Sequence, residues 1–191
     1  MSVPSWFSAE QVKILEFAQG HHYGQKRKYT GEPYWHHLVS VATLVHIHTP
    51  FSGSGVTVAL LHDILEDTRC TKDELLSFLM YSNDPNAPRT VELVEALTDT
   101  YTKKKFPNMN RKERKSMEAV RMRKTPLLSQ TVKYADIIDN IGSITEHDPE
   151  FADVYVKEKR QLLRYMNAGH FELYLRCCYY VQKALLDLGV S

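Results

Sequence analysis

One short stretch of the chain gathers four side chains that can bind a metal ion or move a proton. Within residues 58–68, which are otherwise apolar, these are His62, Asp63, Glu66 and Asp67. On a helix turning about 100° per residue, the four side chains fall within an arc of about 140°. Carboxylates and an imidazole crowded on one face are costly to desolvate, and a divalent cation would compensate for them. The alternative is a solvated acidic face with a chance histidine, and the stretch alone leaves both interpretations open.

The segments that must position these residues are all predicted to be helices. Ser8 and Gln11, and again Thr71 and Glu74, have the spacing of a helix-capping box. We find no convincing strand pattern and no internal repeat, so the expected fold is all-α, a helical bundle in a single domain over residues 1–191. The expected helices lie at about residues 8–18, 34–45 (ending before Pro50), 58–68, 71–79, 91–97, 127–144, 151–166 and 171–188, with loops between them that include residues 83–88.

The composition indicates a globular protein, but it does not indicate what the protein binds. The 191 residues are 43% hydrophobic and 25% charged, with a formal net charge of +1, which is typical of a globular domain rather than a disordered chain. Three cysteines, of which Cys177 and Cys178 are adjacent, are poorly suited to a disulfide framework, so we expect a reducing, cytoplasmic setting. No signal peptide and no membrane-spanning run is visible.

Positive charge is concentrated in two places. The loop cluster Lys26, Arg27 and Lys28 could hold phosphates or could be a solvated loop. Residues 103–124 contain ten basic and two acidic side chains, which is usually a solvated helix face but concentrates positive potential in a chain that is otherwise near neutral.

Polar residues on the inward faces of three expected helices form a plausible ligand set. His37 lies on the second helix, His62 and Asp63 lie in the opening stretch, and Asp136 lies on the helix that follows Pro126. Two imidazoles and two carboxylates suit Mn, Fe or Zn and leave coordination positions for water or substrate. Such an open set predicts a catalytic metal site.

The motifs in this order resemble those of a known family, the HD superfamily. The resemblance is specifically to the hydrolase domain of the RelA/SpoT group and to the stand-alone small alarmone hydrolases, and it covers about residues 10–165. The motifs that carry it are Tyr34-x-x-His37, His62-Asp63-x-x-Glu66-Asp67-Thr68 and Lys133-Tyr134-Ala135-Asp136-x-x-Asp139-Asn140.

The resemblance implies a role for each matching residue. His37, His62, Asp63 and Asp136 match the metal ligands, for which manganese is the usual ion, with Zn or Fe as alternatives. Glu66 and Asp67 match an acidic pair that would orient or deprotonate the attacking water and assist proton transfer. Arg27, Lys28 and Asn140 match residues that contact the nucleotide.

The implied activity is removal of the 3′-pyrophosphate from guanosine 3′,5′-bis(diphosphate), the alarmone of the stringent response, and from its pentaphosphate analogue. The expected partner is therefore a small-molecule nucleotide, with no nucleic acid and no membrane, and the oligomeric state stays open. Two alternatives remain: an HD phosphatase acting on a nucleoside monophosphate or on NADPH, and a nucleotide-binding regulator without turnover.

The sequence departs from the family pattern in ways that motivate these alternatives. Leu38 replaces the proline that commonly follows the first ligand histidine, and the additional His36 leaves either histidine as the ligand. The usual Phe-Gly pair after the fourth helix is absent, and residues 84–89 form a longer expected loop. We expect such changes to alter access to the site and therefore substrate choice.

Overall fold

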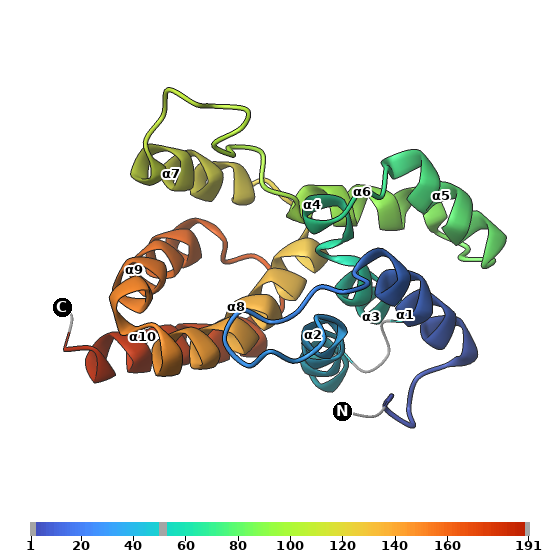
Figure 1. Cartoon of the computed structure of the whole chain (residues 1–191), viewed down its shortest axis with the longest axis horizontal. Helices are drawn as coiled ribbons and strands as arrows, with labels where there is room; N and C mark the ends of the chain where they lie inside the picture. Colours follow the sequence, from blue (N-terminus) through green and yellow to red (C-terminus); the bar gives the residue numbers. More distant parts are fainter. Residues whose placement is uncertain (1–2, 50–52, 190–191) are drawn as a thin grey trace. The chain divides into compact units, whose positions relative to one another are not determined.

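The computed structural model describes residues 3–49 and 53–189, and over these ranges the chain is built from α-helices, as expected (Figure 1). Pro50, predicted to end the second helix, lies outside the described residues. An isolated antiparallel bridge joins Lys26 to Pro33. The helices are α1 (Ala9–His21), α2 (Trp35–His48), α3 (Gly53–Leu61), α4 (Ile64–Asp67), α5 (Lys72–Tyr81), α6 (Ala87–Leu97), α7 (Arg111–Met122), α8 (Leu127–His147), α9 (Pro149–Tyr165) and α10 (Phe171–Asp187).

The chain forms two compact units, Met1–Thr98 and Asp99–Ser191, which are described separately below as unit 1 and unit 2. A single domain over the whole chain stays a prediction. None of the described helices is both long and apolar enough to cross a membrane.

Helix α3 is the centre of unit 1. It packs against α1, α2 and α6, and its residues from Gly55 to Leu61 are all buried. A helix that is apolar on every side is stable only when other helices surround it. The capping box at Ser8 forms in full, and it fixes the start of α1 beside α3. Helix α3 therefore places the residue that follows it, His62, at the end of a rigid, enclosed element.

Two predicted features of unit 1 differ in the structure, although the helix start at Thr71 is confirmed. At Thr71 only the first half of the capping box forms: the Thr71 side chain accepts a hydrogen bond from the Glu74 backbone N–H, whereas the Glu74 carboxylate reaches His21 instead. Helix α6 begins at Ala87, inside the predicted 83–88 loop, with a proline in its first turn. Proline is tolerated there because the first N–H groups of a helix have no partner within the helix.

Unit 2 is organised around the long helix α8, which packs against α9 and α10, while α7 packs on α9. Polar side chains of α8 hold the segment before α10 in place. Gln130 accepts a hydrogen bond from the Ala168 N–H (2.9 Å), Thr131 accepts one from the His170 N–H (2.9 Å), and the Tyr134 hydroxyl donates to the Met166 carbonyl (3.0 Å). These bonds provide partners for backbone groups of residues 166–170, which would otherwise be buried without hydrogen bonds.

Gly169 is expected to be essential for this docking. A Cβ at that position would lie 2.7 Å from the Tyr134 ring and 2.9 Å from both the backbone nitrogen and the hydroxyl of Thr131. We expect Gly169→Ala to lower the free energy of unfolding by about 1–3 kcal/mol because the loop must move off α8. The measurement is urea denaturation followed by circular dichroism.

The matched control for this prediction is Gly142→Ala, also in unit 2. A Cβ at that exposed position on α8 meets nothing within 4 Å. It should leave stability unchanged or raise it by about 0.5–1 kcal/mol through helix propensity. Equal stability of the two variants would contradict the proposed role of Gly169.

Candidate metal centre

The His62–Asp63 pair lies at a break between two helices. Helix α3 ends at Leu61, and Asp63 (φ −102°, ψ −1°) is the N-cap of the short α4. The prediction of one continuous helix over residues 58–68 was therefore wrong at this pair. The Asp63 side chain makes no capping bond, because its carboxylate is engaged by a tyrosine and two histidines, as described next.

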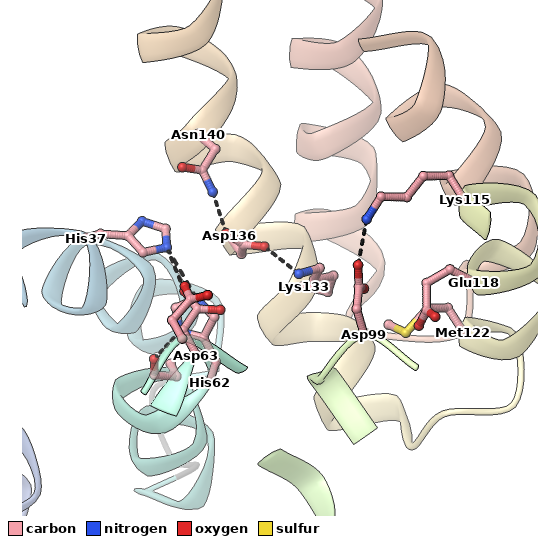
Figure 2. Close-up of polar contacts among 12 residues, drawn as sticks. His37, His62, Asp63, Asp99, Lys115, Glu118, Met122, Lys133, Asp136 and Asn140 are labelled. Carbon is pink, nitrogen blue, oxygen red and sulfur yellow. Dashed lines mark hydrogen bonds and ion pairs between the residues drawn. The ribbon is translucent and has the colours of Figure 1, made fainter. Parts of the chain in front are cut away.

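Two imidazoles and one carboxylate converge in unit 1 (Figure 2). His37 on α2 and His62 bring their Nε2 atoms to 3.2 Å of each other. The Oδ2 atom of Asp63 lies 2.9 Å from His62 Nε2 and 3.5 Å from His37 Nε2. All three side chains are buried, with the two histidines 2% and 1% exposed. The three donor atoms thus share one small, enclosed volume.

This donor set fits a divalent metal ion. The Nδ1 atom of His62 lies 2.8 Å from the Ala59 carbonyl oxygen, so Nδ1 donates to that carbonyl and Nε2 is the ring nitrogen that faces His37 and Asp63. Donor atoms about 3 Å apart match bond lengths of about 2.0–2.2 Å to a common ion. Burial alone would raise the pKa of Asp63, but the charge and hydrogen bonds of the two histidines outweigh burial and hold the pKa well below its usual range.

The two neighbouring histidines of α2 have different surroundings. His37 contacts His62 and Asp63, whereas the Nδ1 atom of His36 lies 3.3 Å from a Glu32 carboxylate oxygen. Of the two alternatives left open by the sequence, the geometry favours His37 as the ligand.

Tyr34 is a site residue to which the sequence analysis gave no role. Its hydroxyl donates a hydrogen bond to Asp63 Oδ2 (2.6 Å) and a longer one to Asp67 Oδ2 (3.3 Å). The available signal was its position one helical turn before His37, which places both side chains on one face. Tyr34 therefore orients the carboxylate that the two histidines share.

The acidic pair Glu66 and Asp67 follows on α4, where both residues are exposed. Partial desolvation, and next the negative charge of Asp63, raise the pKa of Asp67. The Gln25 side chain donates a hydrogen bond to the Asp67 carbonyl (2.8 Å), and His22 Nδ1 lies 2.8 Å from the Gln25 side-chain oxygen. The backbone that carries the acidic pair is thus fixed to the segment after α1.

Arg27 and Lys28 lie in unit 1 on the loop between α1 and α2. The Arg27 backbone N–H bonds to the Glu32 carbonyl (2.8 Å), and the side chain is partly buried. The exposed Lys28 ammonium donates to the Tyr29 hydroxyl (2.9 Å) and lies 4.6 Å from the centre of that ring. A role for either cation in binding the nucleotide stays a prediction.

Asp136 belongs to unit 2, where two residues of its own helix hold it. The Nζ atom of Lys133 lies 2.8 Å from Asp136 Oδ2, and the Asn140 amide donates a hydrogen bond to Oδ1 (2.6 Å). The carboxylate is 5% exposed. Asn140, expected to contact the nucleotide, here orients Asp136. The participation of Asp136 in a metal site with His37 and His62 stays a prediction.

The basic run of residues 103–124 is partly neutralised within unit 2. Arg111 forms a two-pronged ion pair with Glu158 (2.7 and 2.9 Å), and Lys115 bonds to Asp99 (2.5 Å), as Figure 2 shows for the latter pair. Glu118 is buried and accepts hydrogen bonds from two backbone N–H groups and from Arg121. This run is less available to an outside partner than its composition suggests.

A helical chain with a buried histidine–aspartate pair at a helix break belongs, by fold and site, to the class of HD-type domains. The chain is a member of the HD domain family, whose model matches residues 15–164. The resemblance noted from the sequence motifs is confirmed.

Three similar proteins illustrate the family. A guanosine-3′,5′-bis(diphosphate) 3′-pyrophosphohydrolase of Drosophila melanogaster, MESH1, is 27% identical over 144 residues, which cover 74% of this chain and 73% of that protein. An enzyme of the same name from Aquifex aeolicus is 30% identical over 161 residues, covering 81% of this chain but only 20% of its own length. A solved structure, described as a metazoan ortholog of SpoT that hydrolyzes ppGpp, has a TM-score of 0.77 at 22% identity, covering 98% of this chain and 100% of that one.

The Tyr34 hydroxyl is expected to contribute to metal affinity. Tyr34→Phe removes the bond that orients Asp63 while keeping the ring, so affinity for a divalent ion should fall by about tenfold or more with the fold retained. Isothermal titration calorimetry with Mn²⁺ measures this loss of metal affinity. Tyr29→Phe, which removes a hydroxyl bonded to Lys28, is the control and should leave the affinity unchanged; an equal loss in both variants would contradict the role of Tyr34.

Proposed function

We propose that this protein is a metal-dependent phosphohydrolase that removes the 3′-pyrophosphate from guanosine 3′,5′-bis(diphosphate) and its pentaphosphate analogue. The observation that carries the proposal is the buried convergence of His37, His62 and Asp63, with Glu66 and Asp67 on the turn that follows. The activity for which the Drosophila and Aquifex relatives are named supports it.

We assign the metal to His37, His62, Asp63 and Asp136, with Mn²⁺ as the proposed ion. When bound, such an ion supplies Lewis-acid chemistry that activates a water nucleophile and polarises the phosphoryl group. The chain provides the ligands and their orientation: Ala59 sets the tautomer of His62, and Tyr34 fixes the Asp63 carboxylate.

We assign the remaining steps to the acidic pair of α4 and to the cations of the loop between α1 and α2. Glu66 orients the attacking water and accepts its proton, and Asp67, whose pKa is raised, passes a proton toward the leaving group. Arg27 and Lys28 neutralise phosphate charge as the substrate binds. Asn140 has a positioning role through Asp136 in addition to the proposed contact with the nucleotide.

The proposed setting is a reducing cytoplasm, in keeping with three free cysteines. The proposed partner is a small nucleotide rather than a nucleic acid, in keeping with the ion pairs that occupy part of the basic run.

A substrate panel tests the proposed function directly. Purified protein with Mn²⁺ should release pyrophosphate from guanosine 3′,5′-bis(diphosphate) with a catalytic efficiency at least about tenfold above that for a nucleoside monophosphate or NADPH. The reverse preference would favour an HD phosphatase of different specificity. Tight, metal-dependent nucleotide binding without product would favour the regulator.

Two substitutions should separate metal binding from proton transfer. Asp63→Ala removes a buried ligand and should abolish both metal binding and turnover. Glu66→Ala removes an exposed carboxylate, so it should retain the metal while kcat falls by about 10²–10⁴-fold. Metal analysis by mass spectrometry and pyrophosphate release measure the two effects. Normal turnover by Glu66→Ala would contradict the assigned role even if the family assignment stands.

A further inference from the structure

A second group of metal-ligating side chains lies in unit 1 and shares no residue with the cluster of His37, His62 and Asp63. It comprises His21 in the last turn of α1, Cys70 just before α5, and Glu74 in the first turn of α5. One donor atom from each lies within 4.8 Å of the others. The Nε2 atom of His21 is 3.5 Å from Glu74 Oε1. None of these residues takes part in the function proposed above.

An aromatic contact between α1 and α5 brings His21 and Glu74 together. Phe17 stacks on Phe78 with ring centres 3.8 Å apart and planes at 5°. His21 lies one turn after Phe17 and Glu74 lies one turn before Phe78, so the stacked rings align the imidazole with the carboxylate. The stacked rings therefore set the positions of His21 and Glu74, whereas Cys70 lies in the short connection between α4 and α5.

Local hydrogen bonds fix Cys70 and leave Glu74 available. The Cys70 N–H donates to the Thr68 hydroxyl (3.0 Å), which itself donates to the Ile64 carbonyl (2.6 Å). The Cys70 side chain is buried. At the third position of α5, Glu74 would ordinarily complete the capping box with Thr71. Its carboxylate is directed toward His21 instead.

We propose that His21, Cys70 and Glu74 form a Zn²⁺ site with a fourth position for water. A thiolate, an imidazole and a carboxylate are the donors that zinc takes in proteins, at about 2.0–2.3 Å each. The histidine–aspartate cluster holds only nitrogen and oxygen donors and suits a harder ion. The thiolate distinguishes the two sites, because it changes both the metal that the site prefers and the absorption spectrum of a bound ion.

Metal binding at this site requires a proton to leave Cys70. Burial, and next the charge of Glu74, raise the pKa of the thiol to about 11, so the sulfur is protonated at neutral pH without an ion. On binding, the S–H proton passes to solvent as the sulfur–metal bond forms. Because binding releases the thiol proton, affinity should rise with pH. In the absence of an ion, His21 and Glu74 form only a partly exposed pair, which contributes little to stability.

Cobalt substitution gives a readout specific to the thiolate. Co²⁺ added to the full chain should produce a near-ultraviolet sulfur-to-cobalt absorption that Zn²⁺ abolishes. The band should persist in Asp63→Ala, which removes the other centre, and in Cys178→Ser, which removes a more exposed thiol. It should disappear in Cys70→Ser. Absence of the band in the wild-type protein, or its full persistence in Cys70→Ser, would overturn the proposal.

Two milder substitutions keep the test decisive if Cys70→Ser does not fold. Glu74→Gln and His21→Gln should each weaken Zn²⁺ binding by at least about tenfold, measured by competition with a chromophoric chelator in the Asp63→Ala background. Glu16→Gln on the exposed face of α1 is the matched control and should leave Zn²⁺ affinity unchanged. Unchanged affinity in both ligand variants would refute the site while leaving the proposed hydrolase activity untouched.

Discussion

The structure of unit 1 depends on the compensation of one buried carboxylate. Asp63 is enclosed with two imidazoles and a tyrosine hydroxyl, all within 2.6–3.5 Å of a single oxygen. An unpaired charge in such a position costs several kcal/mol, so its partners must be supplied by other elements. Tyr34 and His37 come from the beginning of α2, and His62 comes from the end of α3. The packing of α2 on α3 is therefore tied to the electrostatics of the site.

The same constraint accounts for the helix break that the sequence did not reveal. No glycine or proline interrupts residues 58–68, and their apolar pattern predicts one helix. The break occurs because Asp63 contacts residues 26 and 29 positions earlier, and local propensity contains no information on such contacts. By contrast, the capping box at Ser8 and the start of α8 at Leu127, directly after Pro126, depend on neighbouring residues alone, and both were predicted correctly.

The site residues also divide into those that the sequence identified and those that only the folded contacts reveal. Histidine and aspartate in a family-like order identified the candidate ligands, because metal chemistry requires those residue types. Tyr34 and Lys133 stood inside the quoted motifs without a role, since a phenol or an ammonium becomes meaningful only once its partner carboxylate is placed beside it. Asn140 was expected at the nucleotide, yet its position four residues after Asp136 also makes it a hydrogen-bond donor to that carboxylate. The four-residue spacing of Asp136 and Asn140 on one helix would have predicted this second contact.

Helix α4 carries the acidic pair although it is only four residues long. A helix of that length is not stable by itself, because the free-energy cost of nucleation exceeds the stabilisation that one hydrogen-bonded turn provides. The positions of Glu66 and Asp67 must therefore come from the ends of the segment. Asp63 anchors the beginning through its buried contacts, Gln25 holds the Asp67 carbonyl, and the Thr68 hydroxyl links the end of α4 to Cys70. A metal ion bound by Cys70 would fix the far end of the segment, as an ion at Asp63 would fix the near end. The acidic pair would then lie on a segment held at both ends.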